Sequence, residues 1–325
     1  MKFLIVDDEH ELYKVMMADL FHQTEYDVEE IPRMKLPPIF QKLYDLHYTY
    51  RMDIPFKSIW NHFYTLHKYP FDNNETYIVL FMNGSFRKHF DRQYLVRVKR
   101  KHPNVRFALL LFDHSSYFSA KRCMKMRDIF DHVFSFDDGD CKQYNMEKFY
   151  TCFSVSQNLH HDESMKNMAY FVGSGIGRLD LLKRVFTKIS SQVPDCKFYI
   201  TEVPQEHMTQ IPGVLYNTPI SFAQEMQMAY NTNCIVEIVK YNQKGISLRV
   251  CEAILFNKKL LTNNHNIKNL PFYDSRYMSI FTDEKDLDIN FIQSEVKVQY
   301  DYHGEFSPVR VLDRIMEKER HARKY

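Results

Sequence analysis

The sequence predicts an α/β protein in which two Rossmann-like domains, each built on a parallel β-sheet, face one another across a cleft. Its 325 residues are more than one ordinary α/β domain needs and are enough for two. Short apolar runs alternate with charged segments of helical spacing, which is the pattern of a parallel sheet covered by helices. The alternation stops in a polar stretch at residues 154–168 and then begins again.

The first half of the chain supplies one of these sheets. Strands are expected at residues 2–6, 77–82, 105–112 and 132–136. The run YIVLFM is apolar throughout and VRFALLLF is apolar except for Arg106, as in strands that are buried on both faces. Helices are expected between the strands, at residues 34–48, 56–67, 93–101 and 120–130. We therefore place an N-terminal, acceptor-side domain at residues 1–157.

The second half repeats the alternation. Strands are expected at residues 169–172, 197–200, 234–239, 259–262 and 278–281. Helices are expected at residues 176–189, at 221–230 with Ser221 as the cap, and at 246–256. This gives a C-terminal domain at residues 166–308, followed by a charged helix at 309–325. Because ligands of open α/β sheets bind at the carboxyl ends of the strands, the loops that follow strands should carry the function.

Composition limits the class of protein. The formal net charge is only +2, so the overall charge does not require nucleic acid, and 45% hydrophobic residues exclude a disordered chain. The six cysteines are scattered and form no CxxC pair, so reduced thiols in the cytoplasm, without a signal peptide, are expected. No stretch approaches the ~18–20 apolar residues that span a bilayer. We expect a cytoplasmic protein that is at most peripheral on the inner face of the plasma membrane.

Two loops of the second half have the place of a ligand site. The first, GSGIGR at residues 173–178, opens a helix after a strand, where backbone N–H groups and an arginine favour an anion. It lacks the GxGxxG spacing of a dinucleotide site, and its alternative interpretation is a tight turn with an exposed arginine. In the second, Gly245, Arg249 and Glu252 stand at i, i+4 and i+7 and share a helix face.

Spacing within this second segment suits a nucleotide. Ser247 and Glu252 are offset by about 7–8 Å along the helix axis, which fits a diphosphate at the helix N-terminus and a ribose further along. The carboxylate would accept hydrogen bonds from the ribose hydroxyls. The alternative is an exposed pair between Arg249 and Glu252 at i, i+3 on the helix surface.

The segment RVCEAILFNKKLLTNN resembles the donor-site signature of GT-B glycosyltransferases, in particular bacterial enzymes that build lipopolysaccharide core, capsule and exopolysaccharide. The resemblance extends to YFVGSGIGRLDLLKRVF and ISFAQEMQMAYNTNCIVEIV before it, and to LLLFDHSSY and HVFSFDDGDCKQYNM in the first half. It covers most of residues 76–265, and the second half is the more specific part.

This resemblance implies a glycosyltransferase, of the hexosyltransferase class, that moves a sugar from a nucleotide-diphosphate donor to a surface-glycan or lipid-linked acceptor. Glu252 would hold the donor ribose, the amides of residues 245–248 the diphosphate, and Arg178 and Arg249 would offset the charge of the leaving group. No metal or other cofactor is expected, and Asp138-Gly139-Asp140, a literal DxD, is interpreted as a turn. The implied donor-binding residues are Gly173, Ser174, Gly175, Arg178, Gly245, Ile246, Ser247, Leu248, Arg249 and Glu252.

The departures from the family pattern matter for the chemistry. Lys244 stands where the retaining enzymes carry an acid, so retention or inversion is left open, and Asn257 replaces the usual glycine. A non-catalytic GT-B-like protein that binds nucleotide or glycan, and another Rossmann-type dinucleotide enzyme, therefore stay as alternatives.

An inverting reaction needs a general base near the acceptor hydroxyl. Asp113 and His114, which follow the strand at residues 105–112, are the candidates; their alternative is a capping Asp with an incidental His. His10 is weaker. It lies in a polar loop after KFLIVD, a segment that resembles the opening of a response-regulator receiver but lacks the later acceptor Asp, since Asn83 follows the corresponding strand.

A basic stretch with interleaved aromatic residues, FRKHFDRQYLVRVKRKHPNVRF, begins at residue 86. Lys and Arg near an anionic membrane contribute about 1 kcal/mol each, so this stretch could dock the first domain on a membrane. The alternative is a solvated helix face, and no motif supports nucleic acid as a partner. The patch consists of Arg97, Lys99, Arg100 and Lys101.

Overall fold

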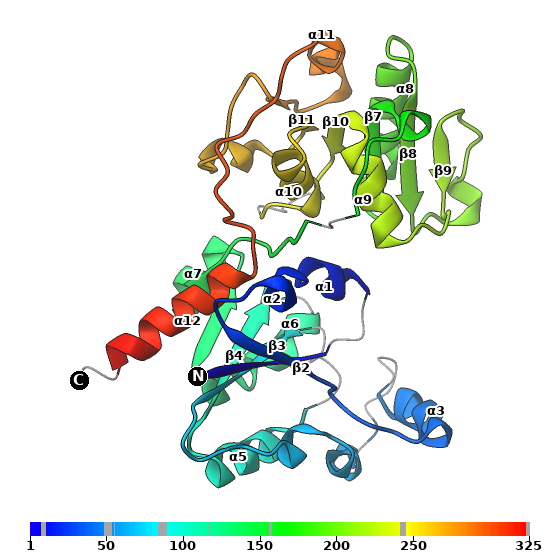
Figure 1. Cartoon of the computed structure of the whole chain (residues 1–325). Helices are drawn as coiled ribbons and strands as arrows, with labels where there is room; N and C mark the ends of the chain where they lie inside the picture. The colour runs from blue at the N-terminus through cyan, green and yellow to red at the C-terminus, as the bar shows by residue number, and fades with distance from the viewer. Residues whose placement is uncertain are drawn as a thin grey trace. The chain divides into compact units, whose positions relative to one another are not determined.

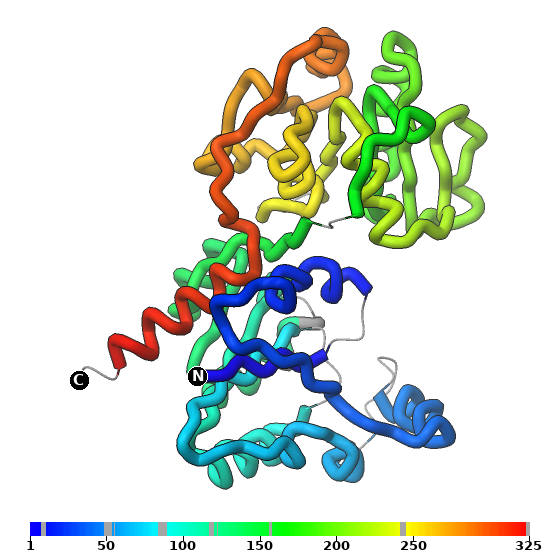
Figure 2. Tube along the Cα trace, viewed as in Figure 1, coloured from blue at the N-terminus to red at the C-terminus, as the bar shows by residue number. Residues whose placement is uncertain are grey.

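The computed structural model describes residues 1–7, 11–48, 54, 56–83, 90–116, 118–155, 158–240 and 245–322. The chain forms two compact units (Figure 1). Unit 1 consists of Met1–Cys152 and Pro308–Tyr325, and unit 2 is Phe153–Ser307. The chain therefore leaves unit 1 once and returns to it, as the tube in Figure 2 shows. The charged C-terminal helix, which the sequence suggests as a separate segment, belongs to unit 1.

Unit 1 contains a six-stranded parallel sheet in the order β2-β1-β3-β4-β5-β6. Its strands are β1 (Lys2–Val6), β2 (Asp27–Ile31), β3 (Tyr77–Met82), β4 (Val105–Leu111), β5 (His132–Ser135) and β6 (Glu147–Lys148). The four strands expected from apolar runs are all present. β2 is hard to recognise because its segment DVEEI carries three acidic residues, which a strand at the sheet edge can expose to solvent.

Helices cover both faces of this sheet. They are α1 (Glu11–Met16), α2 (Asp19–His22), α3 (Pro38–His47), α5 (Arg92–Lys101), α6 (Phe118–Met124), α7 (Asp138–Tyr144) and α12 (Val309–Ala322), with 3₁₀ turns η1 (Lys57–His62), η2 (Leu66–Lys68) and η3 (Arg127–Ile129). The single helix expected at residues 56–67 is wrong: Tyr64 forms a bridge with Met34, which interrupts the helical path between η1 and η2. α12 packs Val311, Leu312 and Ile315 into the core.

Unit 2 contains a second six-stranded parallel sheet, in the order β12-β11-β10-β7-β8-β9. Its strands are β7 (Asn167–Ser174), β8 (Cys196–Thr201), β9 (Val214–Tyr216), β10 (Thr232–Glu237), β11 (Lys259–Thr262) and β12 (Met278–Ile280). The chain runs outward from β7 to β9 and then returns to add β10 on the other side of β7. This is the strand order of a Rossmann sheet, and the prediction of two parallel-sheet α/β units is confirmed.

Unit 2 contains four α-helices among the residues described. They are α8 (Leu179–Ser190), α9 (Phe222–Tyr230), α10 (Leu248–Leu255) and α11 (Ile289–Gln293), with 3₁₀ turns η4 (Glu163–Met165), η5 (Gln205–His207), η6 (His265–Asn269) and η7 (Glu284–Asp286). Ser221 caps α9 as expected and forms a capping box with Gln224. α8 begins three residues later than expected because Gly177 has a φ of 74°, which a right-handed helix does not allow.

Two further expectations concern the whole chain. Within the ranges described, no helix is long and apolar enough to cross a membrane. The six cysteines are all free thiols, and five of them are buried.

Candidate functional site

The strongest candidate site in unit 2 lies where the strand order reverses, between β7 and β10. Loops that leave two adjacent strands in opposite directions open a crevice at the carboxyl ends of those strands, and ligands of open α/β sheets bind there. Four polar side chains gather at these strand ends, and we call them the switch-point cluster. They are Arg178, Glu237, Ser247 and Thr262.

Arg178 joins the ends of the two strands. Its Nε donates to the carbonyl of Ser174, 2.7 Å away at the end of β7, and one terminal nitrogen donates to the carbonyl of Ile238 just after β10. The guanidinium also lies over the Phe171 ring, 5.4 Å from its centroid. Burial lowers the pKa of Arg178, and the nearby Glu237 opposes that shift. The structure therefore replaces the expected exposed-turn alternative with a half-buried arginine fixed at the switch point.

Gly173 makes room for this arginine. A Cβ atom on Gly173 would lie 2.8 Å from a terminal nitrogen of Arg178. Since no side-chain atom fits there, the glycine at this position allows the guanidinium to approach the backbone closely. Gly173 thus helps to determine where Arg178 lies in the loop at residues 173–178.

Glu237 is the acid at the centre of the cluster, and it is buried. Its two carboxylate oxygens accept hydrogen bonds from the hydroxyls of Ser247 and Thr262, the latter at 2.5 Å. Burial raises the pKa of Glu237, while these hydroxyls and Arg178 oppose the shift. Glu237 is absent from the sequence-based candidates. In the sequence, the only indication of its importance is that it ends the run CIVE, whose other residues are apolar. Burying a carboxylate there without hydrogen-bond partners would cost free energy.

The loop before α10 is attached to the end of β11. Asn264 donates to the carbonyl of Gly245 over 3.2 Å, and Asn263 accepts from the backbone N–H of Val239 over 2.7 Å. Ser247 caps α10 by accepting from the N–H of Arg249. Ile246 and Leu248, two other predicted donor residues, flank this cap and are partly exposed. The structure therefore brings residues 245–248 to the same strand ends as Arg178.

The burial of Arg249 and Glu252 was expected from neither interpretation of their spacing. They are paired at 2.7 Å, but both are buried, so an exposed surface pair is wrong. Arg249 also pairs with Glu225 of α9, so its guanidinium is held between two carboxylates, and its role in offsetting the charge of a leaving group stays a prediction. Burial raises the pKa of Glu252 to about 8, with Arg249 opposing and Glu225 adding to the shift.

This burial bears on the predicted ribose contact. Glu252 has 0% of its surface exposed, so a ribose can reach its carboxylate only if neighbouring side chains move. Among the residues described, neither Glu252 oxygen has a hydrogen bond of good geometry. The contact between Glu252 and the ribose stays a prediction.

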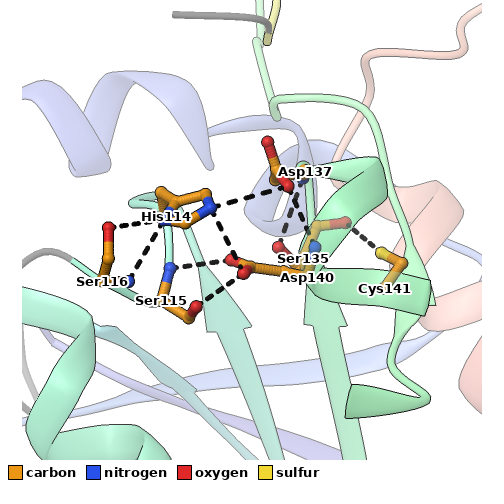
Figure 3. A network of polar contacts seen from close by, with 7 residues as sticks. All are labelled: His114, Ser115, Ser116, Ser135, Asp137, Asp140 and Cys141. Carbon is orange, nitrogen blue, oxygen red and sulfur yellow. Dashed lines mark hydrogen bonds and ion pairs between the residues drawn. The ribbon is translucent and has the colours of Figure 1, made fainter. Parts of the chain in front are cut away.

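Unit 1 contains a second group of polar side chains in mutual contact, which we call the His114 cluster (Figure 3). It consists of His114 and Ser116 after β4, and Asp137 and Asp140 after β5. His114 Nε2 lies 3.5 Å from an oxygen of Asp140 and 3.9 Å from one of Asp137. On the other side of the ring, Nδ1 lies 2.7 Å from the Ser116 hydroxyl. The imidazole is therefore held between a hydroxyl and two carboxylates.

The two carboxylates of this cluster are fixed by the backbone. Asp140 is buried and accepts from the N–H and the hydroxyl of Ser115, at 2.7 and 2.6 Å. Asp137 caps α7 by accepting from the N–H of Asp140. The DxD at Asp138 is thus the first turn of a helix. His114 and Ser116 line an open pocket of about 1050 Å³ whose wall includes Lys121, Lys125 and Arg127.

His114, Asp137 and Asp140 also have the chemistry of a metal site, since their ligand atoms lie within 4.8 Å of one another. A histidine that gives Nε2 to a metal carries its own proton on Nδ1. Here Nδ1 accepts the backbone N–H of Ser116 over 3.1 Å, so the neutral ring carries its proton on Nε2, toward the carboxylates. The hydrogen bonds therefore favour a His–Asp pair over a bound cation.

The remaining predicted residues make other contacts or lie outside the described residues, and the role of Asp113 as a base stays a prediction. Asp113 accepts from the side chain of Asn83 over 2.8 Å. His10 lies outside the described residues. In the basic patch, Lys99 pairs with Asp131 at 2.8 Å, so its charge is already neutralised, whereas Arg97, Arg100 and Lys101 are exposed.

No protein-family model matches the sequence, and no curated protein is significantly similar to it. Solved structures, however, share its fold. A UDP-N-acetylglucosamine 2-epimerase candidate from Listeria monocytogenes has a TM-score of 0.54 and 9% identity, covering 96% of this chain and 94% of that one. An α-glucosyltransferase in complex with UDP and a 13-mer DNA has a TM-score of 0.53, 14% identity and 90% coverage of both chains. HepE of Anabaena in complex with UDP-glucose has a TM-score of 0.50 and 12% identity, covering 90% and 89%.

Proposed function

Because this chain has the GT-B fold that these solved structures share, we propose that it is a glycosyltransferase with a nucleotide-diphosphate sugar as donor. The observation that carries the proposal is the switch-point cluster, in which an arginine and a capped helix N-terminus meet at the carboxyl ends of β7 and β10. Such an arrangement favours an anionic ligand. In this proposal unit 2 binds the donor, the amides of residues 245–248 and Arg178 contact the diphosphate, and unit 1 binds the acceptor.

Thermal shift with a panel of UDP, GDP, CDP, ADP and NAD tests the donor site. Stabilisation by one nucleoside diphosphate, with turnover of the matching sugar donor, supports the transferase. Stabilisation by NAD alone would instead favour a dinucleotide enzyme. Binding of a nucleoside diphosphate without turnover of any donor would favour a non-catalytic binding protein.

Replacing Arg178 should weaken donor binding. We expect Arg178→Gln to lower the affinity for the preferred nucleoside diphosphate about tenfold or more, because a charge-assisted contact to phosphate is lost. Gly173→Ala should act in the same direction, since its Cβ displaces the guanidinium. Titration calorimetry measures both. Arg184→Gln is the matched control, because Arg184 lies on α8 but pairs with Glu284 at 3.0 Å; an equal loss in that variant would contradict the assignment.

We propose Glu252 as the partner of the donor ribose once its surroundings rearrange. The test compares the affinity of the preferred nucleoside diphosphate with that of its 2′-deoxy analogue, in the wild type and in Glu252→Gln. Loss of the 2′-hydroxyl should weaken binding to the wild type more than binding to the variant. Equal losses in both proteins would show that Glu252 does not contact this hydroxyl.

We propose His114 as the general base of an inverting, metal-independent transfer. The lone pair of Nδ1 now faces Ser116, whose hydroxyl lies 2.7 Å away, so an acceptor hydroxyl must displace the Ser116 contacts before Nδ1 can take its proton. The opposite N–H faces carboxylates that would stabilise an imidazolium. Metal independence is tested by adding EDTA to the transfer assay. Rates should be unchanged, whereas a loss restored by a divalent cation would indicate that the His114 cluster holds a metal.

The acceptor in this proposal is a surface glycan or a lipid-linked glycan, as part of polysaccharide synthesis. Lys121 and Lys125 in the wall of the pocket beside His114 would suit phosphate groups on such an acceptor, although Asp128, Asp131 and Glu147 also line this pocket. Two of the similar solved structures suggest other reactions that the assay should include. The likeness to an α-glucosyltransferase crystallised with DNA calls for duplex DNA as one acceptor, and the likeness to an epimerase candidate calls for a reaction without acceptor. Epimerised donor in that last arm would replace the transferase proposal.

We further propose that unit 1 docks on an anionic membrane from the cytoplasmic side. α3 exposes Ile39, Leu43 and Leu46 at 78%, 54% and 58%, which is unusual for apolar side chains on one helix face. The nearby turn η1 exposes Ile59, and α5 adds basic residues. Leu43→Ser should lower co-sedimentation with vesicles that contain phosphatidylglycerol. Ile176→Ser, which changes an exposed residue of unit 2, is the control; equal binding by the Leu43 variant and the wild type would contradict the proposal.

A further inference from the structure

A second pocket of unit 1, of about 380 Å³, lies between η1, η2 and α5. Every titratable side chain in its wall except a tyrosine is basic, and no acidic residue lines it. These basic residues are His62, His67, Arg97, Lys101 and His102. A concave site with five basic groups and no carboxylate has the character of an anion site.

Two permanently charged groups of this pocket form no ion pair within the fold. In the part of the chain that the structure describes, neither Arg97 nor Lys101 pairs with a carboxylate, although two other basic residues of α5 do. Those are Arg92, paired with Asp128, and Lys99, paired with Asp131. The pocket therefore keeps the charges of Arg97 and Lys101 uncompensated.

One buried nitrogen at the pocket also lacks a partner. Nε2 of His102 is buried and forms no hydrogen bond among the residues described. Unsatisfied polar atoms are uncommon in folded proteins, and an imidazole nitrogen of this kind in a wall of basic side chains can donate to an anion when the ring is protonated.

We propose that this pocket binds a phosphate or pyrophosphate group, carried by a lipid headgroup or by a soluble compound. Arg97 and Lys101 would supply the permanent charge, and the three histidines would supply N–H donors when protonated. His102 precedes β4 and His114 follows it, so the pocket lies at the opposite end of a seven-residue strand, roughly 20 Å from the His114 cluster at ~3.3 Å per residue. The site is thus separate from sugar transfer and does not depend on that proposal.

Binding should be linked to pH. Burial lowers the pKa of His67, and Lys68, His62, Lys101 and Arg97 lower it further. His67 also contacts the Tyr94 hydroxyl at 3.0 Å. Burial and Lys101 likewise lower the pKa of His102, which packs on the Phe71 ring. A bound phosphate favours the protonated imidazoles and so raises these pKa values; for a ligand of constant charge, affinity therefore increases as the pH falls.

Titration calorimetry of the full chain with inorganic pyrophosphate, at about pH 6 and about pH 8 and constant ionic strength, tests the proposal. Saturable binding should be tighter at the lower pH and should fall about tenfold or more in the double variant Arg97→Gln, Lys101→Gln. Arg100→Gln is the matched control, because Arg100 is an exposed residue of α5 outside the pocket wall. An Arg178→Gln background removes the contribution of the proposed donor site.

The outcomes are distinct. An equal loss in Arg100→Gln, no saturable binding to the wild type, or affinity that does not change with pH would each overturn the proposal. Vesicles of phosphatidylcholine with and without phosphatidic acid identify the source of the phosphate. If the double variant loses binding to the acidic vesicles and Arg100→Gln does not, the ligand is a headgroup. If only pyrophosphate binding responds, the ligand is soluble.

Discussion

Replacing Arg249 by Met should destabilise the protein by about 3–5 kcal/mol, because it leaves the buried carboxylate of Glu252 and the partly buried carboxylate of Glu225 without their common cation. Arg249 is 6% exposed and pairs with Glu225 of α9 and Glu252 of α10, so it ties two helices of unit 2 together. Chemical denaturation measures the loss. Arg276→Met is the control, since Arg276 pairs with Asp274 on the surface and 71% of its side chain is exposed; that variant should unfold like the wild type.

The destabilisation should depend on pH in a defined direction. The pKa of Glu252 is raised to about 8, above its value in the unfolded chain, so the folded state binds the proton more strongly. Its ionisation therefore lowers stability as the pH rises from about 4.5 to 8. Without Arg249 the carboxylates repel each other when ionised, so the loss should be larger at the high end of this window. Glu252→Gln should remove most of this dependence; a pH-independent loss in Arg249→Met would contradict the buried arrangement.

Replacing His114 by Ala should lower kcat for sugar transfer by about 10²–10⁴-fold, which is the usual contribution of a general base. Unit 1 should fold normally, because 42% of the His114 side chain is exposed. Asp140→Asn should also lower kcat, since the imidazolium formed during transfer would lose the carboxylate that faces it. Steady-state kinetics and thermal unfolding of the same variants separate a chemical role from a structural one.

Two controls sharpen this prediction. Ser116→Ala removes a hydroxyl that an acceptor would replace, so its kcat should stay close to that of the wild type. His303→Ala changes an exposed histidine beside Asp301, outside both clusters, and should be silent. If His114→Ala keeps wild-type kcat, or if its loss is matched by a loss of folded protein, His114 is not the base.

The fold was largely predictable because its signals are local. Strand β3 is a continuous apolar run, β4 is one apart from Arg106, and the cap at Ser221 is a property of four consecutive residues. Errors occurred where a distant contact decides the local structure, as when the bridge between Met34 and Tyr64 divides an expected helix. The edge strand β2 shows the opposite case, because its acidic residues conceal its pairing with β1.

The candidate site was predictable only in part for the same reason. Sequence spacing places Arg249 and Glu252 on one helix face, but whether that face is buried depends on Glu225, which lies 24 residues from Arg249 on another helix. Glu237 becomes significant only when Ser247 and Thr262 arrive from two other elements. Pairing of His114 with Asp140 joins the ends of two strands. In each case residues far apart in the sequence meet because of the order in which the strands and helices pack, and a single sequence does not show that order.

The return of α12 to unit 1 has a consequence for biosynthesis. Unit 2 is one continuous stretch of chain, whereas unit 1 needs Val311, Leu312 and Ile315 to complete one face of its core. On a ribosome, all of unit 2 emerges before these three side chains do. Part of an apolar sheet face within the first 152 residues therefore stays uncovered while the whole of unit 2 is translated. During that interval the nascent chain is exposed to aggregation, and chaperones that cover apolar surface would have their greatest effect on this protein.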